Sequence, residues 1–95
     1  MFLHVTQARH LRDYQIEVIF NDGRSGVADL TDALLGPMFE PLRDVAVFSR
    51  VQVDPDMETI VWPNGADMAP EFLYFSAFKD ESALHEQFRQ WGYLV

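Results

Sequence analysis

Residues 14–24 have the sequence YQIEVIFNDGR and carry the strongest structural signal in the chain. Large apolar side chains occupy every second position, at Tyr14, Ile16, Val18 and Phe20. This period of two predicts a strand with one buried face. The Asp-Gly pair that follows fits a tight turn with positive φ, so a hairpin and a return strand over residues 24–30 are expected. Gly26 indicates a bulge or a close backbone approach within that return strand.

Outward from this hairpin, three more strands are expected, over residues 3–10, 49–54 and 59–62. Short helical segments are expected over residues 31–37, started by Asp29 or Thr31 and stopped by Gly36 and Pro37, and at residues 41–44. Pro70 predicts a helix reaching residue 77. The predicted fold class is therefore α+β, a small and mostly antiparallel sheet of about five strands with short helices and a C-terminal amphipathic helix. Residues 1–95 are predicted to form a single domain.

Apolar spacing also predicts which side chains face the core. Four of them follow the first helical segment: Phe39, Leu42, Val45 and Phe48.

The C-terminal helix is expected to begin at Asp80, a favourable N-cap residue, and to stop at Gly92. Its apolar stripe consists of Leu84, Phe88 and Trp91, and the tail continues apolar to Val95. Two roles are open for this stripe. The helix either folds back over the sheet and completes the core, or packs across a two-fold axis or onto a partner as an interface.

Composition limits the class of protein. Of the 95 residues, 48% are hydrophobic, which is too apolar for intrinsic disorder. There is no cysteine, which excludes disulfides and favours the cytoplasm. The N-terminus shows no signal-peptide pattern, and no apolar run is long enough for a membrane helix. A cytoplasmic chain without membrane contact is expected.

The net charge of −8 limits which partners the chain is expected to bind. The seven basic residues are scattered, so no stripe is available to neutralise phosphates and no direct nucleic-acid binding is expected. The charge is compatible with a basic protein partner, and a homodimer is the other protein partner considered.

Catalytic, cofactor and metal motifs were sought and none is predicted. Residues 54–58 alternate acids as a calcium loop does, but the required Gly and Glu positions hold Thr59 and Gly65. His4 and His10 are too far apart along one strand to share a metal. Asp29 and Asp67 are paired carboxylates that would act together only if the fold brings them close, and capping is the commoner use of such residues.

The most distinctive stretch is residues 62–67. Its members Trp62, Pro63, Asn64, Gly65 and Asp67 combine an aromatic, a rigid turn and an acid, which would suit a ligand-binding corner. The alternative is a purely structural strand end and turn, for which the same residue types are typical.

This block, with Asp29-Leu30, residues 39–44, Phe48, Pro70-Glu71 and Leu73-Tyr74, resembles the bacterial domain-of-unknown-function family 2442 from about residue 4 to residue 75. The resemblance adds Tyr74 to the signature residues, that is, the residues of this chain that carry the family pattern. It implies a small α+β domain with an antiparallel sheet, and it implies no enzyme activity, cofactor or catalytic residue.

The resemblance also suggests partners. Some members of the family look like fusions with a C-terminal helix-turn-helix. That motif needs two packed helices, and residues 79–95 are too few to form them. Small stand-alone members resemble one half of two-gene pairs. The hypotheses are therefore a protein-binding module, such as an antitoxin-like partner of a small basic protein, and a regulatory DNA-associated or ligand-sensing dimerisation domain. A small-molecule binder or enzyme built on Trp62, Asn64 and Asp67 is the third.

Overall fold

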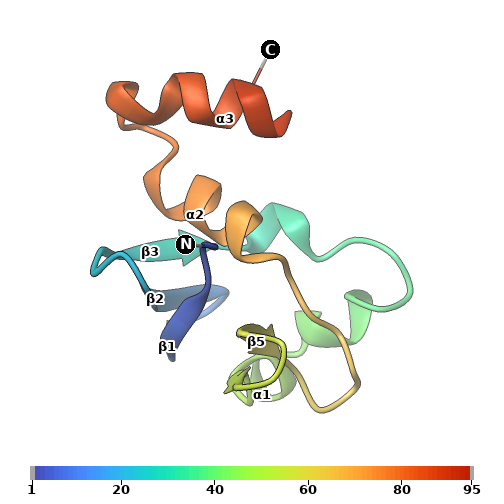
Figure 1. Cartoon of the computed structure of the whole chain (residues 1–95). Helices are drawn as coiled ribbons and strands as arrows, with labels where there is room; N and C mark the ends of the chain where they lie inside the picture. The colour runs from blue at the N-terminus through green and yellow to red at the C-terminus, as the bar shows by residue number, and fades with distance from the viewer. Residues whose placement is uncertain (1, 95) are drawn as a thin grey trace.

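Two antiparallel sheets and two stacked helices form an α+β fold (Figure 1). This computed structural model describes residues 2–94. The first sheet has the order β1-β2-β3, with β1 at Val5–Arg12, β2 at Gln15–Phe20 and β3 at Ser25–Asp29. The second pairs β4 at Gln52–Asp54 with β5 at Thr59–Val61. The helices are α1 at Val45–Phe48, α2 at Pro70–Phe78 and α3 at His85–Trp91. Three 3₁₀ turns are η1 at Thr31–Ala33, η2 at Glu40–Arg43 and η3 at Ser82–Leu84.

The predicted hairpin joins β2 to β3. Gly23 has a φ of +88° and is the only residue of the turn with a positive φ. Its N–H donates to the Phe20 carbonyl at 3.0 Å, and the Phe20 N–H donates to the Arg24 carbonyl at 2.9 Å. This is a three-residue loop in which glycine supplies the left-handed position. The sequence therefore predicted both the place of the turn and the residue that makes it possible.

Helix α2 packs against the first sheet at Gly26. A Cβ on Gly26 would lie 2.8 Å from the Phe78 ring and 3.1 Å from the Ala77 Cβ. The β2–β3 register runs without a shift, so Gly26 permits a close approach and does not mark a bulge. The Phe20 ring packs edge-on against Tyr74, with centroids 4.9 Å apart. Small size at one strand position thus brings the helix onto the buried face of the sheet.

The second sheet joins the same buried cluster. The Val5 N–H of β1 donates to the Glu58 carbonyl at 3.0 Å, which links the two sheets. The Trp62 indole N–H donates to the Phe48 carbonyl at 2.9 Å, and the two rings pack at 5.6 Å. One continuous apolar cluster therefore runs from β1 and β2 through α1 to β5 and α2.

Helix α2 lies between the first sheet and α3 (Figure 1). Its residues Leu73, Tyr74 and Phe78 are buried. A different ring, Phe75, packs on Phe88 of α3 with centroids 5.1 Å apart. Helix α2 therefore carries apolar side chains on more than one side, because the sheet covers one side and α3 another.

Several predicted details were wrong. The helix expected over residues 31–37 is only the η1 turn, and its N-cap position is Leu30, without a side-chain cap. Val45 is 39% exposed because it starts the short helix α1, which the sequence did not predict. Asp80 does not cap the last helix: Glu81 holds the N-cap position of η3, and α3 begins only at His85. Met1 and Val95, the first and last residues of the predicted domain and tail, lie outside the described residues.

Candidate binding groove

A groove of about 650 Å³ lies beside α2 and receives side chains from five parts of the chain. Four aromatic residues line it: Phe39, Phe72, Phe75 and Tyr93. Three carboxylates line it as well: Asp29, Asp32 and Asp67. We call this surface the acidic groove. It combines an apolar lining with negative charge, a pairing that recurs where proteins bind ligands or one another.

One face of α2 contributes two of the four aromatic residues of the lining. Phe72, Phe75, Ser76 and Lys79 follow the spacing i, i+3, i+4 and i+7, so they share a helix face. The phenylalanines are half-buried. This face is distinct from the one that packs on the sheet, and α3 covers it only in part.

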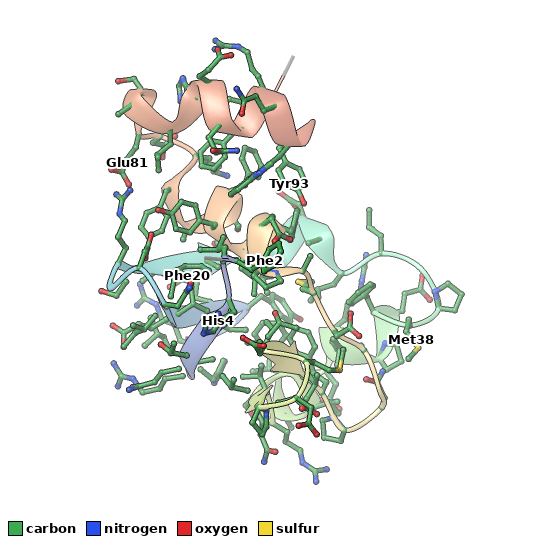
Figure 2. The ribbon with its side chains drawn as sticks, viewed as in Figure 1. Phe2, His4, Phe20, Met38, Glu81 and Tyr93 are labelled. Atoms are coloured by element: carbon green, nitrogen blue, oxygen red, sulfur yellow. The ribbon has the colours of Figure 1, made fainter. Side chains whose placement is uncertain are left out.

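Tyr93 is placed over α2 by the end of α3. Gly92 has a φ of +89°; its N–H donates to the Arg89 carbonyl and the Tyr93 N–H to the Phe88 carbonyl. These two bonds are those of a Schellman motif, which turns the chain back. The Tyr93 ring consequently stacks on Phe75 with centroids 5.2 Å apart (Figure 2). Burial, and to a lesser extent Glu71, raises the pKa of Tyr93 above its usual value, so its hydroxyl stays neutral at pH 7.

The three carboxylates of the groove differ in their partners. Asp29 ends β3, and its Oδ1 accepts from the Thr31 hydroxyl at 2.6 Å and the Thr31 N–H at 3.0 Å. These bonds hold the pKa of Asp29 below its usual value, so it is ionised at neutral pH. Within residues 2–94, no hydrogen bond or ion pair engages the carboxylates of Asp32 and Asp67. Both side chains are exposed and available to a partner.

The structure places the block at residues 62–67 mostly outside the groove. Trp62 is buried in the core. The Asn64 Nδ2 donates to the Met38 carbonyl at 2.9 Å, and its Oδ1 accepts from the Ala66 N–H at 3.0 Å. Gly65 has a φ of +88°. Together these residues form a turn that ties the loop before η2 to the end of β5.

Of the remaining signature residues, Asp67 lines the acidic groove, whereas Pro63 is exposed beside another hollow next to Ser49 and Arg50. The Tyr74 hydroxyl donates to Asp22 Oδ2 at 2.8 Å, within the core contact between α2 and the hairpin. The structure thus brings Asp29 and Asp67 to one groove and keeps Tyr74 and Trp62 away from it.

The C-terminal candidates face α2 of the same chain. Phe88 is fully buried, whereas Leu84 and Trp91 are half-buried. The Trp91 ring packs edge-on against Tyr74 with centroids 6.1 Å apart. Helix α3 folds onto α2 and not onto the sheet. The core role expected from the sequence had the helix folding back over the sheet.

Sequence analysis missed Asp32, Phe72, Phe75, Lys79 and Tyr93. A usable signal was present in residues 70–78, where aromatic residues occupy more positions than one buried stripe requires. That excess indicates a helix with a second apolar face.

The histidines lie apart. His4 Nδ1 is 3.1 Å from Glu58, His10 Nε2 is 2.9 Å from the Asp13 carbonyl and His85 Nε2 is 3.0 Å from the Lys79 carbonyl. The Asp54 carboxylate accepts from the N–H groups of Asp56 and Met57, closing its own turn. Across residues 2–94, no three His, Asp or Glu side chains are placed so that they could hold a metal ion. None of the helices in this part of the chain is long and apolar enough to cross a membrane.

Comparison with known proteins gives one structural match and one family. The crystal structure of "Putative DNA Binding Protein NE0471 from Nitrosomonas europaea ATCC 19718" superposes with a TM-score of 0.75 at 18% identity. The match covers 100% of this chain and 64% of that one, so the present chain spans less than two thirds of its structural neighbour. At this identity the likeness concerns the fold. No curated protein sequence matches the chain at a significant level.

The family model described as "Protein of unknown function (DUF2442)" matches residues 5–79, from the start of β1 to the residue after α2. This span includes both sheets and most of the acidic groove, and it ends before α3 and Tyr93. The chain therefore belongs to the DUF2442 family of proteins of unknown function.

Proposed function

We propose that this chain is a non-catalytic, cytoplasmic protein-binding module that holds its partner in the acidic groove. The observation that carries the proposal is the groove itself, in which half-buried aromatic rings stand beside two carboxylates, Asp32 and Asp67, that no other described residue engages. Protein interfaces commonly place aromatic anchors at the centre and polar groups at the margin. The groove also holds no histidine, and its only serine, Ser76, donates weakly to the Asp29 carbonyl at 3.4 Å. The described lining therefore offers no serine–histidine pair of the kind that activates a hydroxyl nucleophile.

Exposed apolar side chains near the groove support the proposal. Leu35 is 65% exposed and Met38 is 47% exposed, and both belong to the loop that carries Phe39. Leu35 also lines a second hollow with Asp32, so the two hollows adjoin at one carboxylate. An apolar loop beside an aromatic groove offers a larger contact than the groove alone, as a protein partner requires.

The partner favoured by the charge is a small basic protein, in the manner of an antitoxin-like pair. The chain carries a net charge of −8, and three of its seven basic residues are already in ion pairs: Arg9 with Glu17, Arg24 with Glu81 and Arg89 with Glu86. Complementary charge accelerates association and disfavours acidic competitors.

Affinity capture from the native host tests the proposal with one blocking variant and one matched control. Ala69 is exposed and lines the groove, so Ala69→Trp is expected to fill it. Ala83 is an exposed alanine in η3 outside the groove, and Ala83→Trp is the control. A partner retained by the wild type and by Ala83→Trp, and lost with Ala69→Trp, is the expected result. Equal retention by both variants would place the interface elsewhere and refute the proposal.

A second candidate function is a regulatory, DNA-associated domain. It is favoured by the fold shared with a protein described as a putative DNA binding protein. In this role the chain would contribute dimerisation or sensing, because its bases are scattered and partly paired. A gel shift with duplex DNA at about 50 mM salt, where phosphate contacts are strongest, is expected to show no binding. Retardation at low micromolar protein would favour this second candidate.

A further inference from the structure

The acidic groove leaves two carboxylates to a ligand. Asp32 and Asp67 are exposed, and neither is engaged by another described side chain. Lys79 is the one basic side chain among the described residues that line the groove, and it makes no ion pair with Asp29. Three carboxylates against one ammonium leave the groove with unbalanced negative charge. A cationic group is therefore the complementary occupant.

The aromatic lining narrows the choice of cation. Phe72, Phe75 and Tyr93 all line the groove, with the Tyr93 ring stacked on Phe75 and edge-on to Phe72. A guanidinium stacks on aromatic faces and binds carboxylates through a planar set of donors, whereas an ammonium is more strongly hydrated and does neither as well. The chain already contains this arrangement elsewhere: the Arg24 guanidinium lies 4.4 Å from the Phe78 ring centroid and pairs with Glu81.

The volume of the groove indicates that more than one side chain of the partner would occupy it. About 650 Å³ falls in the range of pockets that bury a drug-sized ligand. One arginine side chain leaves room beside it, and the lining also includes the apolar residues Phe39, Met68 and Ala69. Apolar neighbours of the arginine would occupy this space.

We infer that the acidic groove binds an arginine of the partner, flanked by apolar residues, with the guanidinium between Asp32 and Asp67. This inference rests on the proposed function and specifies what the bound segment contains. The arginine supplies both the charge that pairs with the carboxylates and the flat surface that packs on the rings. The apolar neighbours supply the buried area.

Calorimetric titration with two synthetic peptides tests the inference. The probes are the amidated peptide Ac-Gly-Leu-Arg-Leu-Leu-Gly and the same peptide with citrulline, an uncharged isostere, in place of arginine. At about 50 mM salt the arginine peptide is expected to bind about tenfold more tightly, the effect of one charge-assisted contact. The variant Asp32→Asn/Asp67→Asn should bind both peptides alike. Asp56→Asn/Asp80→Asn, with the same change in net charge at exposed positions outside the groove, should keep the preference.

The outcomes separate this inference from the proposed function. Equal binding of the two peptides, no binding of either up to about 1 mM, or loss of the preference in Asp56→Asn/Asp80→Asn would overturn it. If the native partner is still lost with Ala69→Trp in such a case, the groove binds a protein by other chemistry and the proposed function stands. If the arginine preference is present but Ala69→Trp retains the native partner, the proposed function fails instead.

Discussion

Arg24 joins the hairpin to the segment between α2 and α3. Its guanidinium pairs with Glu81, contacts the Tyr74 hydroxyl at 3.4 Å and lies over the Phe78 ring (Figure 2). The hydrogen bond that Arg24 donates to Glu81, followed by the one that it donates to Tyr74, raises the pKa of Arg24 above its usual value. One side chain therefore fixes where the chain leaves α2, and so where α3 and Tyr93 are placed.

Arg24→Ala is expected to lower the free energy of unfolding by about 1 kcal/mol, since the ion pair and the ring contact are lost together at a partly exposed site. Arg9→Ala is the matched control, because the Arg9–Glu17 pair is an isolated surface contact with Arg9 70% exposed. Its expected effect is below about 0.5 kcal/mol. Urea denaturation measures both. Equal effects would show that the Phe78 contact adds nothing.

Asp29, which lines the groove, makes a pH-dependent contribution to the stability of the folded chain. Its pKa is lowered from the usual 3.8, first by the Thr31 hydroxyl and then by the Thr31 N–H. A lowered pKa in the folded state stabilises the fold above pH 3.8, and this stabilisation is lost as the pH falls through the folded-state pKa. Acidification below the usual range of aspartate therefore weakens the turn between β3 and η1.

Thr31→Val removes the stronger of these two bonds and is expected to move the pKa of Asp29 up toward 3.8. The difference in stability between wild type and variant should shrink as the pH falls below that value. Carbon-13 NMR titration of the carboxyl group measures the shift. Thr6→Val, which removes an exposed threonine hydroxyl bonded to the Ile19 carbonyl, should leave it unchanged. An unchanged pKa in Thr31→Val would contradict the assigned cause.

Among the contacts between secondary-structure elements, the packing of α2 on β3 is the most sensitive to an added side chain. Gly26→Ala would place a methyl group 2.8 Å from the Phe78 ring and 3.1 Å from the Ala77 Cβ, both in a packed interface. Overpacking of this kind costs about 1–3 kcal/mol. Gly23→Ala meets no atom within 4 Å and costs only the strain of its positive φ, about 1 kcal/mol.

Thermal and chemical denaturation are expected to rank Gly26→Ala as the more destabilising of the two. Loss of the α2 contact should also reduce near-ultraviolet circular dichroism from the aromatic rings of α2. If Gly26→Ala is as stable as the wild type, α2 does not pack against β3 at this distance.

Helix α3 covers part of the second apolar face of α2. Phe88 is fully buried and packs on Phe75, so Phe88→Ala is expected to lower the free energy of unfolding by about 3 kcal/mol. Phe2 is 94% exposed, and Phe2→Ala is the matched control with little expected effect. A stable Phe88→Ala variant that has lost self-association would instead assign the C-terminal stripe to an interface.

Individual elements were predictable where local chemistry alone determined them. The alternation at residues 14–20, the glycine of the hairpin and Pro70 at the start of α2 each reflect backbone preferences that neighbouring residues do not override. Helix α1 and the start of α3 were not predicted, because both depend on tertiary contacts. Asp44 caps α1 by accepting from the Ala46 N–H, although the short helical segment expected from the sequence ends at residue 44.

At the scale of the whole molecule, the acidic groove depends on parts of the chain that are distant in sequence. Asp29 and Asp67 were recognised as carboxylates that the fold would have to bring together, and both line the groove. Phe72 and Tyr93 were not recognised, because nothing local shows that α3 covers only part of the second apolar face of α2. Surface charge was predictable, whereas the place where it meets exposed aromatic rings was not.

Photo-crosslinking in the native host shows whether a protein partner contacts the acidic groove. A photoreactive p-benzoylphenylalanine is placed at position 35, which is exposed in the loop beside the groove, and in a matched experiment at position 83, which lies outside it. A cross-link from position 35 to one basic protein is expected, absent from position 83 and absent from position 35 when Asp32 and Asp67 are both replaced by Asn. A partner that cross-links from position 83 and never from position 35 would refute binding in the groove.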